Sequence, residues 1–370
     1  MSSKAKFLRK RMFHLYLWVI FTAALPYSVF GGSSDLHQTV KQAYQLRMDG
    51  KADQAVVLLN QILSSDSTNA AAHYELARTE HHMALGNPRE MMGKINAVQS
   101  SIKKAVKYAP DNMVYSYFNA QTYYLQAYIS LQFGQPGVND KVNKTAAAFE
   151  QVLELKPDCR EALLSLVEIY GWFPADKGGD RVKAEQYAEK LEKVDEVFAA
   201  KANVLLLPED AERTAYWRRI NKENPETPDI LEELAKAYFY ENNADEAEKY
   251  IKEAVKIDPQ KIILYLDLGR FYIMSAMRDK SVMNDVLPLA EAALNKYLES
   301  NPINPLKAFT YGLLAKVKWG SGDKDAGSEF RKKAAELDPF YSKASAVPGL
   351  MLFTALDEMQ IHHSYFSKPF

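Results

Sequence analysis

The 370-residue sequence has a single cysteine, Cys159, and almost no net charge. One cysteine excludes an intramolecular disulfide and leaves a cysteine-based zinc site without its ligands. A formal net charge of −1 argues against a protein that coats nucleic acid. With no partner of its own kind, the Cys159 thiol is predicted to be a small buried apolar residue rather than a nucleophile.

Sequence motifs that carry catalysis are also missing. There is no glycine-rich phosphate loop, no His-Glu-x-x-His pair and no Gly-x-Ser-x-Gly turn. Two adjacent histidine pairs, His81-His82 and His362-His363, suggest a metal site at first sight. Adjacent residues on a helix point about 100° apart, however, which is poor geometry for chelation. The sequence therefore predicts no enzyme activity, no cofactor and no metal.

The N-terminal segment departs from the balanced composition of the rest. Five basic residues and no acidic residue stand within the first eleven positions, and an apolar run covers residues 12–25. This run is shorter than the roughly 20 residues that a membrane-spanning helix needs. Proline and small residues follow it. A basic start, a short apolar run and a small-residue exit together predict a secretory signal peptide over residues 1–31.

Export has consequences for location and charge. The signal peptide predicts a periplasmic or secreted protein, and an uncleaved N-terminal membrane anchor is the alternative. No later stretch is long and apolar enough to span a bilayer, so no transmembrane span is expected after its removal. Removing five of the 46 basic residues leaves 41 against 47 acidic ones, which is a net charge near −6. Such a charge favours solubility and indicates no particular partner.

The body of the chain is repetitive, and prolines mark the repeats. The prolines that follow amphipathic runs are Pro110, Pro157, Pro225, Pro259, Pro302 and Pro339. The spacing is 34 residues from Pro225 to Pro259 and 68 residues, twice that value, from Pro157 to Pro225. The remaining spacings are 37, 43 and 47 residues. Periods of this length indicate stacked supersecondary units.

The clearest unit covers residues 228–261. Its first predicted helix has one apolar face made of Leu231, Leu234, Ala235 and Tyr238, and its second has Ala247, Ile251 and Ala254. Offsets of three, four and seven residues place each set on one helical stripe. Ala235 and Ala247 are small enough to let the two helices approach closely. Residues 242–245 form the predicted turn, with Asp245 as the expected N-cap.

This unit resembles the tetratricopeptide repeat (TPR) family, in which a large apolar residue, Leu, Gly or Ala and Tyr on a first helix precede Ala, an apolar residue, Ala and Pro on a second. The resemblance extends over residues 36–340 in about eight units, of which 198–225 is degenerate. It implies an all-α fold, a right-handed α-solenoid of stacked antiparallel helix pairs. Residues 341–370 are expected to form a C-terminal capping helix and tail. A helix pair cannot bury its apolar face alone, so neighbouring pairs share a core.

The resemblance also implies a binding face. In TPR proteins the first helix of each pair lines a concave groove, and fixed positions on that helix meet the ligand. Those positions correspond here to Tyr74, Arg78, His81, His82, Tyr117, Gln121, Tyr124, Glu168, Trp172, Glu232, Lys236, Phe239, Tyr240, Arg270 and Met274. Aromatic side chains mixed with charged ones suit recognition of a protein or peptide. The family's paired Lys and Asn clamp for a peptide C terminus is incomplete in this chain, which argues against that mode of binding.

Two functions compete on this basis. The first is a non-catalytic exported TPR scaffold that binds a protein or peptide partner in its groove. The second is a solute-binding accessory subunit of a transport system, in which the groove handles a small solute. The connector at residues 171–180 is similar to loops of exported bacterial TPR proteins and of the TPR-type accessory subunits of TRAP transporters. Its last residue, Asp180, is predicted to cap the helix that follows.

Overall fold

The computed structural model describes residues 34–86, 91–208 and 211–346. The predicted signal peptide (1–31) and most of the predicted C-terminal cap (341–370) lie outside the described residues. Within the described residues every regular element is a helix. A search of these helices for a membrane span finds none with the required length and hydrophobicity.

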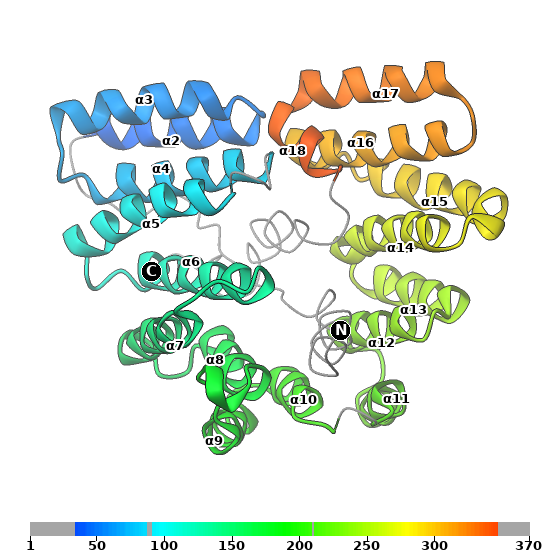
Figure 1. Cartoon of the computed structure of the whole chain (residues 1–370), viewed down its shortest axis with the longest axis horizontal. Helices are drawn as coiled ribbons and strands as arrows, with labels where there is room; N and C mark the ends of the chain where they lie inside the picture. The colour runs from blue at the N-terminus through cyan, green and yellow to red at the C-terminus, as the bar shows by residue number, and fades with distance from the viewer. Residues whose placement is uncertain (1–33, 87–90, 209–210, 347–370) are drawn as a thin grey trace. The chain divides into compact units, whose positions relative to one another are not determined.

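The helices belong to two compact units, each considered by itself (Figure 1). The first contains α2 (Ser34–Met48), α3 (Ala52–Ser65), α4 (Ala70–Leu85), α5 (Met91–Tyr108), α6 (Met113–Gln132), α7 (Val138–Leu155), α8 (Arg160–Trp172), α9 (Arg181–Glu192) and α10 (Glu196–Leu205). The second contains α11 (Arg213–Glu223), α12 (Pro228–Tyr240), α13 (Ala244–Ile257), α14 (Leu264–Arg278), α15 (Met283–Leu298), α16 (Asn304–Gly320), α17 (Lys324–Leu337) and α18 (Pro339–Ala344). Short 3₁₀ turns lie at η1 (Ala175–Lys177), η2 (Pro259–Ile263) and η3 (Lys280–Val282).

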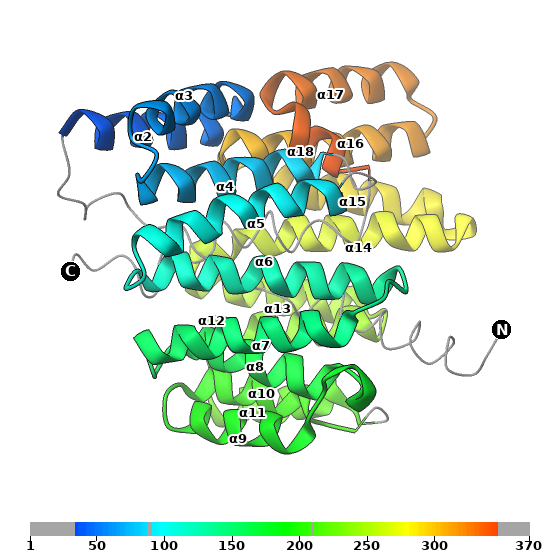
Figure 2. The same cartoon turned by 60° about the vertical axis from the view of Figure 1, so that its left-hand side comes forward.

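Successive helices pack against each other in pairs. In the first unit α4 packs on α5, α6 on α7 and α8 on α9, while in the second α12 packs on α13, α14 on α15 and α16 on α17 (Figures 1 and 2). Helices α2–α17 form roughly eight such pairs, which confirms the predicted all-α architecture of stacked helix pairs. The division between the two units falls after Ala211, inside the segment 198–225 that the sequence marks as degenerate.

Three of the turns within pairs share one backbone conformation. The α2–α3, α12–α13 and α16–α17 turns each have three residues between the helices, and the middle residue has a positive φ. These middle residues are Gly50, Asn242 and Gly322, with φ angles of 79°, 55° and 87°. Only Gly adopts this region without steric cost, and Asn tolerates it better than most residues. The repeated turn therefore explains why Gly or Asn stands at these positions.

The caps of the helices that follow confirm one prediction and correct another. The Asp180 carboxylate accepts a hydrogen bond from the backbone N–H of Lys183 at 3.2 Å and caps α9, as predicted. The predicted cap of α13, Asp245, is wrong. The side chain of Asn243 accepts from the backbone N–H of Glu246 at 3.2 Å instead, and Asp245 lies in the first turn of the helix. The tight turn closes after three residues, so the helix begins earlier than the sequence suggested.

The recurrent prolines mark helix ends. Five of the six lie two residues beyond the last residue of a helix, namely Pro110, Pro157, Pro225, Pro259 and Pro339. Pro302 lies four residues beyond the end of α15. A proline ring has no backbone N–H to donate and clashes with the preceding helical turn, so it cannot continue the helix. The spacing of these prolines in the sequence therefore reflects the length of the helix pairs.

Small residues lie where the two helices of a pair are closest. Ala235 of α12 and Ala247 of α13 are fully buried, as their predicted role requires. At Gly269 of α14 the neighbouring helix leaves no room for a side chain. A Cβ atom there would lie 2.7 Å from both Cγ and Cδ2 of Leu294 and 3.3 Å from the carbonyl oxygen of Ala290, both on α15. A residue larger than glycine therefore requires the Leu294 side chain to move.

Overpacking a filled core usually costs about 1–3 kcal/mol, and alanine gains about 1 kcal/mol over glycine inside a helix. We therefore expect Gly269→Ala to lower the free energy of unfolding by up to about 2 kcal/mol. Gly93→Ala is the matched control, because nothing lies within 4 Å of a Cβ atom at Gly93 of α5. It should stabilise the protein. Urea denaturation of both variants measures the difference, and equal stabilities would contradict the close contact.

Candidate functional site

The fifteen predicted contact residues all lie on the first helix of a pair, on α4, α6, α8, α12 or α14. Ten of them are buried: Tyr74, Arg78, His81, His82, Tyr117, Glu168, Glu232, Lys236, Phe239 and Arg270. Five are half-buried: Gln121, Tyr124, Trp172, Tyr240 and Met274. The helix placement follows the repeat register. Contact of any of these residues with a ligand stays a prediction.

The residues on α4 pack against α6. The Tyr74 ring stacks on Tyr115 with ring centroids 4.6 Å apart and meets Phe118 edge-on at 5.8 Å. The His81 ring meets Phe118 edge-on at 6.0 Å. The Arg78 guanidinium lies over the Tyr74 ring, 5.5 Å from its centroid. The ring contacts of Tyr74 and His81 join α4 to α6 of the next pair, so these two side chains have a structural role whatever else they do.

Helices α6 and α8 are joined by two contacts, one helical turn apart. The Tyr124 hydroxyl donates a hydrogen bond to Glu168 Oε1 at 2.7 Å. Four residues further along each helix, Tyr128 stacks on Trp172 with ring centroids 5.9 Å apart. Residues four apart share a helix face, so these four side chains form one strip, which we call the α6–α8 strip. The indole Nε1 of Trp172 is buried and has no acceptor among the described residues.

The carboxyl group of the α6–α8 strip titrates near neutral pH. Burial raises the pKa of Glu168 to about 7, and the hydrogen bond from Tyr124 opposes this effect only in part. Burial, together with the nearby charge of Glu168, holds the pKa of the Tyr124 hydroxyl well above its usual value. The tyrosine therefore remains a hydrogen-bond donor, while the carboxyl changes charge with modest changes of pH.

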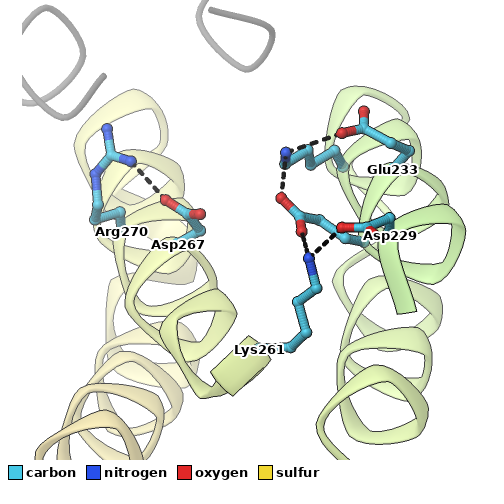
Figure 3. Close-up of polar contacts among 7 residues, drawn as sticks. Asp229, Glu233, Lys261, Asp267 and Arg270 are labelled. Carbon is cyan, nitrogen blue, oxygen red and sulfur yellow. Dashed lines mark hydrogen bonds and ion pairs between the residues drawn. The ribbon is translucent and has the colours of Figure 1, made fainter. Parts of the chain in front are cut away.

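The second unit carries a network of ion pairs on α12 (Figure 3). Glu232 bridges two lysines, with Oε1 at 2.6 Å from Lys236 Nζ and Oε2 at 2.6 Å from Lys261 Nζ. Lys236 also contacts Glu233 at 3.1 Å, and Lys261 contacts Asp229 at 2.5 Å. Lys261 comes from η2, after the second helix of the pair, so the network ties the first helix to the start of the next repeat.

An ion pair on the neighbouring helix α14 completes the network (Figure 3). Arg270 Nη1 donates to Asp267 Oδ1 at 2.8 Å. Burial raises the pKa of Asp267, which the positive charges of Arg270 and Lys236 oppose. Burial alone would lower the pKa of Lys236, but the carboxylates of Glu232 and Glu233 overcome it and raise that pKa. The seven residues hold four acidic and three basic groups, so the network is nearly neutral.

Sequence reasoning found three members of this network, Glu232, Lys236 and Arg270, and missed four. The missed residues are Asp229, Glu233, Lys261 and Asp267. Two signals were present. Asp229 lies one turn before Glu232 on the same helix face, and Asp267 lies one turn before Arg270. The contact of Lys261 with Asp229 spans 32 residues and has no local signal.

Within the described part of the chain, no group of three or more His, Cys, Asp or Glu side chains is arranged to hold a metal ion. Cys159 is 3% exposed, and burial raises the pKa of its thiol to about 12. This confirms its predicted role as a small buried residue, because a thiol with this pKa is not a nucleophile at neutral pH.

Glu232→Gln is expected to destabilise the protein by about 1.5–3 kcal/mol, because Lys236 and Lys261 lose the charged hydrogen bonds that join them through Glu232, while each keeps one other carboxylate. Glu299→Gln is the matched control. Its pair with Lys296 is exposed on both sides, at 49% for the lysine and 64% for the glutamate. Exposed pairs contribute at most about 1 kcal/mol. Chemical denaturation should show a larger loss of stability for Glu232→Gln than for Glu299→Gln. Equal losses would show that the buried network contributes no more to stability than an exposed ion pair.

The raised pKa of Glu168 predicts a pH dependence of stability. In the unfolded chain this carboxyl titrates near 4.5, and in the folded protein near 7. Between these values the folded state binds the additional proton, so this residue's contribution to stability falls as the pH rises from about 4.5 to about 7. The total loss is about 3 kcal/mol, from 1.36 kcal/mol for each pKa unit.

Glu168→Gln removes that titration. The variant should be more stable than the parent at pH 8, and the difference should shrink at pH 5, in urea denaturation followed at both pH values. Tyr124→Phe is the complementary variant, since loss of the donor raises the pKa of the carboxyl further and steepens the dependence. A pH dependence that is unchanged by both substitutions would place the titration elsewhere.

One segment of the second unit matches a known protein family. Residues 228–261, which comprise α12, α13 and the start of η2, match the model of the tetratricopeptide repeat family. A search of the curated proteins finds no match to the sequence. Among solved structures, a thermophilic TPR protein of Thermus thermophilus is 17% identical, with a TM-score of 0.38, over 64% of this chain and 98% of that one.

Two further solved structures are similar to the chain at the same low level. A tetratricopeptide repeat protein of Parabacteroides merdae is 16% identical, with a TM-score of 0.37, over 87% of this chain and 100% of its own. PilW, a type IV pilus biogenesis factor, is 19% identical, with a TM-score of 0.31, over 73% of this chain and 97% of its own. Similarity at this level does not indicate a shared function. The segment 228–261, which matches the tetratricopeptide repeat model, carries five of the seven residues of the charged network.

Proposed function

We propose that the protein is a non-catalytic, exported repeat scaffold that binds a protein or peptide through the first helices of its repeats. Tetratricopeptide repeats typically mediate binding of proteins or peptides and are typically not catalytic. The observation that carries the proposal is the α6–α8 strip. It combines the half-buried rings of Tyr124, Tyr128 and Trp172 with a buried carboxyl group.

Each part of the α6–α8 strip suits a peptide. Tyrosine and tryptophan supply large contact areas at low cost in conformational entropy, which is why they dominate binding energies at interfaces. In the second unit, Met274 on α14 and Tyr240 on α12 are half-buried and offer apolar contacts beside the charged network.

A pair of matched substitutions tests which helix face binds. Met274→Glu introduces a charge on the first helix of a pair, and Leu289→Glu introduces the same charge at an exposed position on the second helix, α15. Cross-linking in the source organism followed by mass spectrometry identifies the partners. The Met274→Glu variant should lose a partner about tenfold, equivalent to 1.4 kcal/mol, while Leu289→Glu retains it. Equal capture by both variants would reject the first-helix face.

A solute-binding accessory subunit is the second candidate, and the α6–α8 strip also supports it. A stacked pair of rings next to a titratable carboxyl suits a small polar molecule as well as a peptide. A thermal-shift screen of metabolites separates the two functions, because a ligand that binds only the folded state raises its stability. A metabolite that stabilises the parent but not a Trp172→Ala variant would favour the solute over the peptide.

Export is proposed from the N-terminal sequence. When the full-length chain is expressed in a bacterium, the mature protein should be found outside the cytoplasm with its N terminus near residue 32. Deletion of the apolar run, residues 12–25, should retain the protein in the cytoplasm. N-terminal sequencing and fractionation measure both outcomes. A full-length protein in the membrane fraction would favour the uncleaved anchor instead.

A further inference from the structure

Helix α5, the second helix of its pair, carries charge of one sign only. It contains four lysines and no acidic residue, and α6, which follows it, contains no charged residue at all. On α9, α13 and α17, by contrast, exposed basic side chains pair with a carboxylate three or four residues away on the same helix, at 2.7 to 3.9 Å. Between residues 91 and 139 the only acidic residue is Asp111. This part of the first unit therefore has an excess of positive charge.

Three of these lysines, Lys103, Lys104 and Lys107, are exposed together near the end of α5. None of the three makes an ion pair within the described part of the chain. Their spacings of three and four residues place like charges next to one another on the helix, which is destabilising. The helix dipole favours a basic residue in the last turn, but only Lys107 lies there. A negative charge from another molecule would relieve the repulsion.

Aromatic rings support these lysines. Helix α5 packs against α4 and α6 (Figure 2), and the Lys103 ammonium lies 5.2 Å from the centroid of the Tyr123 ring on α6. The Lys107 ammonium lies 5.4 Å from the centroid of Tyr108, which stacks on His73 of α4 with ring centroids 5.8 Å apart. These cation–π contacts restrict the lysine side chains, so less conformational entropy is lost when they bind a partner. Tyr108 is 37% exposed and offers an apolar surface beside the charges.

The spacing of the lysines suits an extended acidic peptide. Four residues rise about 6 Å along a helix, which is the separation of Lys103 and Lys107 along α5. In an extended chain, alternate side chains lie on the same side about 7 Å apart. The exposed face of α5 continues through Asn96, Ala97 and Ser100, which are small or polar. It therefore lacks the large apolar side chains with which an interfacial helix enters a membrane.

We propose that Lys103, Lys104, Lys107, Tyr108 and Tyr123, which we call the α5 patch, form a docking surface for an acidic segment of a partner protein. The segment has carboxylates at alternate positions, which pair with the lysines, and its remaining side chains lie against the tyrosine rings. Complementary charge of this kind selects the partner and speeds its association. The α5 patch shares no residue with the α6–α8 strip, so it is independent of the binding surface proposed for the first helices.

Fluorescence anisotropy with labelled peptides tests the proposal on the purified protein. The probe is a short peptide of alternating Glu and Thr, and its uncharged counterpart alternates Gln and Thr. The Glu-Thr peptide should bind more tightly than the Gln-Thr peptide, and its affinity should fall as the salt concentration rises. A variant that combines Lys103→Gln, Lys104→Gln and Lys107→Gln should bind the Glu-Thr peptide about tenfold more weakly, equivalent to 1.4 kcal/mol.

A second triple variant on α13 is the matched control, with Lys249→Gln, Lys252→Gln and Lys256→Gln. It changes the net charge by the same amount at three exposed positions of another second helix. Two of these lysines already have partners, since Lys249 pairs with Glu246 and Lys252 with Glu248. The control should bind the Glu-Thr peptide as the parent does. Thermal unfolding shows whether both variants fold, and the α5 variant should be at least as stable as the parent because like charges are removed.

Three outcomes would overturn the proposal. The parent could bind the two peptides equally, or the two triple variants could lose affinity for the Glu-Thr peptide equally, which would make overall charge the cause. The third outcome concerns other anions, tested with a single-stranded oligonucleotide and with vesicles of anionic phospholipid. If either of these binds through the α5 lysines and the Glu-Thr peptide does not, the α5 patch recognises phosphate groups and not an acidic protein segment.

Discussion

The close approach of the two helices in each pair is the constraint on which the rest of this structure depends. A single pair cannot cover its own apolar face, so each pair packs on the next and shares a core with it. Alanine and glycine at the crossings make this approach feasible, as at Ala235 with Ala247 and at Gly269 against Leu294. Side chains on successive first helices then reach one another, as the stacked rings of Phe239 and Phe271 show.

The same packing determines how buried charged side chains are stabilised. Charged side chains on the first helices are partly buried away from solvent, where an unpaired charge is destabilising. On α12 and α14 this is solved by mutual neutralisation, with Glu232 held between Lys236 and Lys261. Between α6 and α8 it is solved by protonation, because the pKa of Glu168 rises to about 7 next to a hydroxyl donor.

These arrangements also explain why a repeat scaffold suits recognition. Each first helix repeats the same register, so side chains from neighbouring helices meet in rows without any special loop. The α6–α8 strip shows how two such rows place rings and a titratable group side by side. A chain of this kind gains specificity by changing a few side chains while the alanine and glycine contacts that hold the helices remain.

The sequence by itself determined the local features: the all-α architecture, the helix ends marked by proline, the unit at 228–261 and the cap at Asp180. Each depends on residues within one or two helical turns, and their periodicity is visible in the chain. The cap at Asp245 failed because the turn before it closed earlier than its composition indicated. Only the tertiary structure decided which side chains meet across repeats. Lys261 contacts Asp229 over 32 residues and Tyr124 reaches Glu168 over 44, because the spacing and rotation of neighbouring pairs, set by their shared core, bring these groups together.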